Sequence, residues 1–97
     1  MAPEFNVGTT NIIDRSALNL FPNPTESTLH FNLELEEIAE VQVRVYDILG
    51  RVVLEKAYGA DQTSLNAALN VSLLRSGTYI FEASTSLSSV YQKFSIY

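Results

Sequence analysis

The sequence predicts an all-β fold, an antiparallel β-sandwich of about seven short strands. Apolar and polar residues alternate with a period of two in several segments, as in strands that bury one face. These segments recur at a spacing of roughly 8–12 residues, which is typical of sandwiches rather than α/β folds. Hydrophobic residues make up 46% of the 97 residues and charged residues 18%, which is ample for a core and excludes extensive disorder.

The chain is expected to hold one folded domain, residues 15–97, because its length is that of a single domain. Residues 1–14 differ in composition from the rest. Residues 1–5 look like a cloning remnant, and the small and polar residues that follow are typical of a linker. We therefore place residues 1–14 outside the domain as linker or remnant, although Ile12 and Ile13 could add some pairing at a sheet edge.

The first half of the domain predicts three strands. Residues 18–21 form a short strand that ends at Pro22 and Pro24, because proline lacks the backbone N–H that a central strand donates. Residues 29–35 alternate strictly between apolar and polar side chains, which predicts a half-buried strand. After an acidic turn, residues 41–46 repeat this alternation.

The second half predicts four more strands. Gly50 suits a turn that needs a positive φ, and residues 51–58 follow it as a strand whose buried face is ambiguous. Residues 65–71 are interpreted as a fifth strand, although their alanines would also suit a helix. Residues 78–85 and 90–97 form the last antiparallel pair, so the final residues are expected to belong to the sheet.

The alternation also predicts which side chains fill the core. Each of these side chains is expected to point inward from its strand or turn. They are Leu20, Leu29, Phe31, Leu33, Val41, Val43, Val45, Leu74, Tyr79, Phe81, Phe94 and Ile96.

Gly77 and Tyr79 predict a tyrosine corner. A tyrosine that enters the penultimate strand just after a tight turn can pack its ring inward while its hydroxyl bonds to the turn backbone. Gly77 would allow a backbone conformation that a β-branched residue could not adopt. Such corners occur in immunoglobulin-like sandwiches of unrelated function, so this feature predicts the fold only.

Charge and composition exclude several classes of function. The net charge is −5 with only six Lys and Arg residues, whereas nucleic-acid binding requires clustered cations. No apolar stretch approaches the ~20 residues needed to cross a bilayer, so we expect no membrane insertion. The first residues also lack the pattern of a signal peptide. There is no cysteine, so disulfides cannot contribute to stability.

Catalytic and metal-binding candidates are weak. His30 is the one histidine, and it lies on the polar face of a predicted strand, where we expect it to be solvated. Four carboxylates near one turn could contact a hard cation such as calcium: Glu34, Glu36, Glu37 and Glu40. They lack the spacing of a dedicated calcium loop, and a solvated acidic turn that discourages aggregation is the favoured interpretation. We expect no enzyme, no metal and no cofactor.

Five short segments follow one another in a characteristic order. They are Leu-Phe-Pro-Asn-Pro at 20–24, Leu-His-Phe at 29–31, Val-Arg-Val-Tyr-Asp-Ile-Leu-Gly-Arg-Val at 43–52, Leu-Leu-Arg-Ser-Gly-Thr-Tyr at 73–79 and Gln-Lys-Phe-Ser-Ile at 92–96. This succession resembles the type IX secretion (Por secretion system) C-terminal sorting domain, type A. The resemblance covers residues 18–97.

The resemblance implies a targeting signal with an immunoglobulin-like sandwich fold. Such domains follow a cargo protein, are recognised by the type IX outer-membrane translocon and its shuttle components, and are commonly removed by a cell-surface sortase. The cut would fall in or before residues 6–17. The cargo would pass through the periplasm and reach the cell surface or the medium of a Gram-negative bacterium.

The residues that match the family's motifs are the implied recognition signal: Asn23, Pro24, Gly50, Gly77, Tyr79, Lys93, Phe94, Ile96 and Tyr97. Each of them also has a structural explanation, as a strand end, a turn or a core side chain. Many family members end with further Lys or Arg residues, whereas this chain ends in Ile96 and Tyr97. If the secretion machinery contacts a basic tail directly, recognition of this chain must depend on Lys93 and on the shape of the last strand.

The alternative is a non-catalytic binding or adhesion module, such as an immunoglobulin-like or carbohydrate-binding sandwich. A ligand platform would need exposed coplanar tyrosines, and Tyr46, Tyr91 and Tyr97 are predicted to face outward. Tyr91 and Tyr97 would lie about 20 Å apart along one strand, too far for one sugar. An exposed aromatic row would favour this alternative, whereas dispersed tyrosines and a buried terminal strand would favour the sorting domain.

Overall fold

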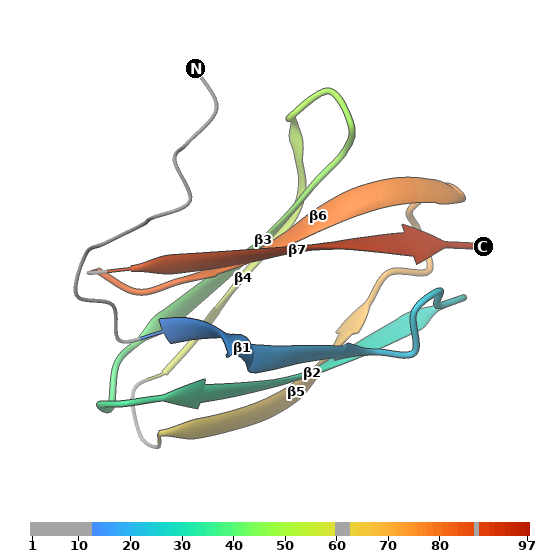
Figure 1. Ribbon diagram of the computed structural model, residues 1–97. Helices are drawn as coiled ribbons and strands as arrows, with labels where there is room; N and C mark the ends of the chain where they lie inside the picture. Colours follow the sequence, from blue (N-terminus) through green and yellow to red (C-terminus); the bar gives the residue numbers. More distant parts are fainter. Residues whose placement is uncertain (1–12, 60–62, 87) are drawn as a thin grey trace.

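The structure is a computed structural model that describes residues 13–59, 63–86 and 88–97, and every regular element in these residues is a β-strand (Figure 1). The strands are β1 (Ile13–Phe21), β2 (Thr28–Leu35), β3 (Val41–Tyr46), β4 (Val52–Tyr58), β5 (Ser64–Asn70), β6 (Gly77–Ser84) and β7 (Ser89–Ile96). The prediction of an all-β chain with seven strands is confirmed. Residues 1–12 of the expected linker lie outside the described part.

The strands form two antiparallel sheets that lie face to face (Figure 1). One sheet has the order β1-β2-β5 and the other β4-β3-β6-β7. In chain order, the connections from β2 to β3, from β4 to β5 and from β5 to β6 pass from one sheet to the other, as expected for a sandwich. In the described residues, no helix is long and apolar enough to cross a membrane.

The core lies between the two sheets and confirms most of the predicted inward positions. Every predicted core residue is buried except Leu74, which is half-buried in the turn after β5 and packs against the edge of the core. Leu74 therefore points toward the core as predicted, but its position in a turn leaves it only half-buried. The prediction missed six further core residues: Leu18, Leu35, Leu69, Val71, Ala83 and Val90.

Two strands differ from their predicted form. β1 begins at Ile13, which pairs with Leu35, and it has an irregular register between Ile13 and Leu18. β4 is an edge strand that leaves most of its side chains exposed, and its inward face carries Leu54 and Tyr58. An edge strand contacts only one neighbour in its sheet, which explains why its alternation in the sequence was ambiguous.

The tyrosine corner is present. The Tyr79 hydroxyl donates a hydrogen bond of 2.6 Å to the carbonyl of Arg75, and the ring stacks on Phe94 with centroids 5.9 Å apart. Gly77 has a φ of +155°, which side chains rarely allow, although a Cβ there would meet nothing closer than 3.9 Å. The backbone conformation therefore accounts for glycine at this turn, rather than a lack of space.

Candidate functional site

The end of β7 is held by the turn at residues 22–25. The Thr25 N–H donates to the Ser95 carbonyl at 3.0 Å, and the Tyr97 N–H donates to the Thr25 carbonyl at 2.9 Å. The Ser95 N–H donates to Oδ1 of Asn23 at 3.2 Å. We call this arrangement of residues 22–25 and 95–97 the terminal clamp. It joins two parts of the predicted signal that lie far apart in the sequence.

Thr25 connects the turn of the terminal clamp to the start of β2. Its side chain is buried, and its hydroxyl donates to the carbonyl of Thr28 at the start of β2. Thr25 also forms an isolated parallel bridge with Ile96. The turn therefore acts as a short extra strand that covers the outer edge of β7 near its end.

The side chains at the end of β7 divide into buried and exposed ones. Phe94 and Ile96 are buried in the core, whereas Lys93 and Tyr97 are exposed. A partner could therefore touch the side chains of Lys93 and Tyr97. Phe94 and Ile96 could contribute to recognition only by holding the strand in place.

The turn between β3 and β4 is organised by Asp47. One carboxylate oxygen accepts the N–H groups of Leu49 at 2.9 Å and Arg51 at 3.0 Å, and the other pairs with the Arg51 guanidinium at 2.8 Å. These bonds, above all that from the Arg51 N–H, lower the pKa of Asp47. Gly50 completes the turn with a φ of +85° and an N–H bond to the Asp47 carbonyl. The turn is held in one conformation by its own contacts.

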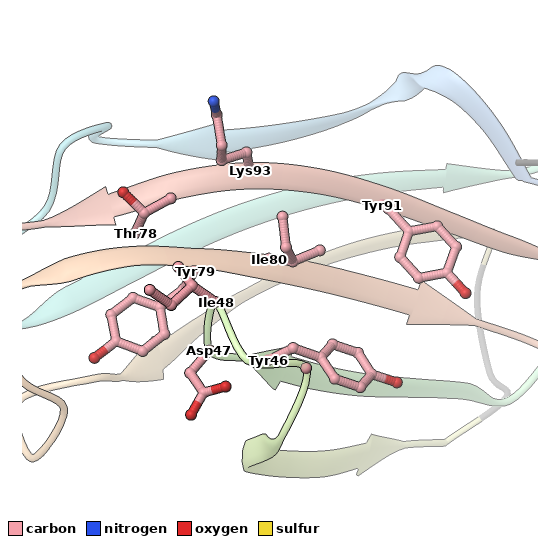
Figure 2. A pocket seen from close by; sticks show the side chains of 9 residues that line it. Tyr46, Asp47, Ile48, Thr78, Tyr79, Ile80, Tyr91 and Lys93 are labelled. Atoms are coloured by element: carbon pink, nitrogen blue, oxygen red, sulfur yellow. The ribbon is translucent and has the colours of Figure 1, made fainter. Parts of the chain in front are cut away.

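A concave region of about 610 Å³ lies on the outer face of the four-stranded sheet, beside this turn. We call it the outer hollow. Figure 2 shows Tyr46 of β3, Ile80 of β6 and Tyr91 of β7 along the sheet, with Ile48 on the turn beside them. Lys93 also lines the hollow, and its amino group points away from the other labelled side chains (Figure 2). The surface that lines the outer hollow is mainly apolar, and the positively charged Lys93 lies at its β7 side.

A buried carboxylate orients the tyrosines of the outer hollow. Glu82 is buried on the outer face of β6, accepts a 2.6 Å hydrogen bond from the Tyr46 hydroxyl, and lies 3.8 Å from the Arg44 guanidinium. Burial and this bond raise the pKa of Tyr46 to about 12, and burial also raises the pKa of Tyr91. Both phenols therefore stay neutral at physiological pH.

The turn beside the hollow exposes two large apolar side chains. Ile48 is 79% exposed and Leu49 is 73% exposed, and Val52 and Val53 at the start of β4 are also exposed. Single exposed apolar residues are ordinary, but four of them within residues 48–53 are not. We call Ile48 and Leu49 the turn tip.

The structure places the predicted signal residues in two neighbouring groups. Asn23, Pro24 and Tyr97 belong to the terminal clamp or its rim, and Gly50, Tyr79 and Lys93 line the outer hollow. Gly77 pairs with Ile96, which links the start of β6 to the end of β7. Both groups therefore lie toward the same end of the sandwich.

The sequence analysis missed several residues of these groups: Thr25, Asp47, Ile48, Leu49 and Ile80. One feature of the sequence could have indicated the turn tip. Adjacent apolar residues between Asp47 and Gly50 are unusual in a turn, where polar residues prevail. Nothing local in the sequence indicates the backbone bonds of Thr25 to Ser95 and Tyr97, because these partners lie at the other end of the chain.

The tyrosines predicted to face outward do not form a row. Tyr46 and Tyr91 are half-buried in the outer hollow, whereas Tyr97 is exposed and lines a separate shallow pocket with Pro24 and His30. The terminal strand lies at the edge of its sheet rather than within it, with its apolar side chains buried. Tyr46 and Tyr91 thus lie together and half-buried while Tyr97 lies apart, so the three do not form one exposed aromatic row.

The candidates for catalysis and metal binding occupy ordinary surface positions. His30 is exposed, as predicted, and its ring stacks on Phe21 with centroids 5.4 Å apart. Glu34 accepts a hydrogen bond from the Ser64 hydroxyl across the β2–β5 pair at 2.9 Å. Among the residues with described positions, no three His, Asp or Glu side chains are grouped to hold a metal ion.

The fold and these surfaces define an antiparallel β-sandwich whose last strand is tied to an early proline turn. A family model described as the secretion system C-terminal sorting domain matches residues 19–97. The chain belongs to this family, which confirms the resemblance found in the sequence. It is also 26% identical over 83 residues to the endo-acting ulvan lyase of Formosa agariphila. That alignment takes in 86% of this chain and spans 15% of the lyase.

Proposed function

We propose that this chain is a non-catalytic signal that directs a preceding cargo protein across the outer membrane by type IX secretion. The observation that carries the proposal is the family match over residues 19–97. The alignment with a small share of a much longer protein supports a module attached to a larger polypeptide. The activity of that relative is not carried over to this chain.

We further propose the steps of export and processing that the family resemblance implies. The domain would meet the type IX translocon and its shuttle components after crossing the periplasm. A cell-surface sortase would then cut amino-terminal to the sandwich and release the cargo or attach it to the surface. Because β1 begins at Ile13, the cut would fall in the part of the expected range 6–17 that precedes residue 13, or before that range. The fold supports such a role for the domain, because a rigid sandwich can present a surface signal that an unfolded tail could not.

The test is a transplant of the 97 residues onto the carboxyl end of a reporter that is exported to the periplasm. The fusion is expressed in bacteria with and without a working type IX system, and reporter is measured at the surface, in the medium and in the periplasm. We expect surface or secreted reporter in the competent strain only. A folded fusion that stays periplasmic in both strains would contradict the proposal and favour a binding or adhesion module.

Sortase processing is tested with the same fusion. Mass spectrometry of the exported reporter should find a new carboxyl end before Ile13, where β1 begins, and the sandwich should be absent from the mature product. An exported reporter that retains all 97 residues would refute removal by a sortase, while leaving the sorting function intact.

A further inference from the structure

We propose that the outer hollow and the turn tip form the surface at which the signal is read, and that the reader is an apolar polypeptide segment with a carboxylate facing Lys93. This inference rests on the proposed sorting function and names the part of the domain that performs it. No residue of the terminal clamp is needed for direct contact. The clamp would act by holding β7 in position.

The turn tip and the outer hollow together form an apolar surface. Ile48 and Leu49 are among the most exposed large apolar side chains of the described residues, and they stand beside a hollow lined by Tyr46, Ile80 and Tyr91. A concave apolar surface next to projecting apolar side chains can bury area on both sides of a contact. Tyrosines at the centre of such a surface frequently carry much of the binding energy.

The turn tip and the Tyr46 hydroxyl are held in place by hydrogen bonds within the domain. Asp47 accepts hydrogen bonds from two backbone N–H groups of its own turn and pairs with Arg51, so the turn tip is held before any partner arrives. The Tyr46 hydroxyl is likewise held by Glu82. A surface that is already ordered loses less conformational entropy on binding, which favours a contact site over an incidental apolar patch.

The charges beside the hollow favour an acidic group on the partner. Asp47 lines the hollow, but its charge is balanced by Arg51. Arg44 and Arg51 are the cations in the ion pairs among the described residues. The positive charge of Lys93 is therefore available to an acidic group of a partner. Its amino group lies at the β7 side of the hollow and points away from the other labelled side chains (Figure 2). A carboxylate on the partner is the complement to this position.

The same charges favour a protein over a lipid surface. The chain carries a net charge of −5, and an anionic membrane would repel it. Membrane-surface binding typically uses clusters of Lys and Arg around the apolar residues, whereas the hollow contains a single lysine. A polypeptide with apolar side chains and one acidic side chain matches the surface better.

The test compares two double variants of the reporter fusion with the same change in composition. Ile48→Ser with Leu49→Ser removes the turn tip. Ile38→Ser with Leu73→Ser is the matched control, because these residues are also exposed, at 57% and 97%, and do not line the hollow. We expect export of the turn-tip variant to fall at least tenfold and export of the control to stay within twofold of the parent. Equal export of both variants would overturn the proposal.

A second pair tests the charge without altering apolar contacts. Lys93→Glu places a like charge opposite the proposed carboxylate and should reduce export at least tenfold, whereas Lys93→Arg should preserve it. Lys56→Glu is the control for net charge, since Lys56 is exposed on β4 and lies over the Tyr58 ring instead. Normal export of Lys93→Glu would refute the charged contact even if the double variant failed to fold.

The failure of this inference is distinguishable from the failure of the proposed function. If the parent fusion is not exported by the competent strain, the sorting function itself is refuted. If the parent is exported and the turn-tip and Lys93→Glu variants are exported equally well, the sorting function stands and this reading surface is wrong. Thermal unfolding of each fusion confirms that a loss of export is not a loss of folding.

Discussion

Tyr79 combines two contributions in one side chain. Its ring is buried against Phe94, and its hydroxyl donates to the carbonyl of Arg75 in the preceding turn. The ring therefore links β6 to β7, while the hydroxyl orders the chain before β6. Two substitutions separate these contributions, because phenylalanine keeps the ring and alanine removes both.

Tyr79→Phe is expected to reduce the free energy of unfolding by about 0.5–1.5 kcal/mol, the net value of one hydrogen bond. Tyr79→Ala should reduce it by roughly 3–5 kcal/mol, because a buried aromatic ring is lost as well. Urea denaturation of both variants measures the difference. A loss below about 1 kcal/mol for Tyr79→Ala would exclude the ring from the core.

Among the elements, the terminal clamp connects the start and the end of the sandwich. Its turn uses backbone groups of Thr25 and the side chain of Asn23 to bond the outer edge of β7. An edge strand with unpaired backbone groups would be open to fraying and to pairing with other chains. The terminal clamp reduces fraying and pairing with other chains at the end of β7.

Asn23→Ala should loosen this end without unfolding the domain. It removes the acceptor of the Ser95 N–H, and we expect a loss of about 0.5–1.5 kcal/mol in stability. Amide hydrogen exchange should show faster exchange at Ser95, while amides in the centre of β6 keep their protection relative to global unfolding. Asn19→Ala, an exposed change on β1, is the control. Unchanged exchange at Ser95 would contradict the clamp.

The β3–β4 turn should make stability depend on pH through Asp47. Its pKa in the folded state lies below the ordinary value of 3.8, because the carboxylate accepts hydrogen bonds from Arg51 and Leu49. A lowered folded pKa stabilises the fold above the ordinary value, and this contribution is lost as the pH falls through the folded value.

Asp47→Asn should therefore be less stable than the parent at neutral pH. The difference in unfolding free energy should shrink on acidification below about pH 4, where the unfolded carboxyl group takes up its proton first. Urea denaturation of both proteins at several pH values measures this difference. A difference that stays constant down to pH 3 would show that the charge of Asp47 does not stabilise the turn.

For the whole molecule, the terminal strand is part of the core rather than an appendage. Phe94 and Ile96 are buried, and β7 pairs with β6 along its full length. A short tail deletion is therefore a poor test of signalling, because it changes the fold together with the signal. Point variants at exposed residues avoid this difficulty.

Removal of residues 93–97 should unfold the domain. The loss of two large core side chains is expected to cost about 5–10 kcal/mol, which is comparable to the total stability of about 5–15 kcal/mol of a typical domain. Circular dichroism and limited proteolysis of the truncated chain would show the loss of structure. A truncated domain that unfolds cooperatively near the parent's midpoint would contradict this role of β7.

Local patterns in the sequence were sufficient for the fold class and most of the core. In β2 and β3 every second residue is apolar, and burial of that face follows from the hydrophobic effect wherever a second sheet covers it. The tyrosine corner was likewise predictable, because Gly77, Tyr79 and their turn are close together in the chain. These features depend on neighbours within a few residues.

The candidate site depended on contacts between distant parts of the chain. Asn23 and Ser95 are 72 residues apart, and no local pattern indicates that their groups meet. Ile48 and Leu49 are as apolar as core residues, and only the packed structure shows that no described segment covers them. Alternation along a strand sets which face is apolar, whereas exposure and long-range pairing are set by how the sheets and turns pack together.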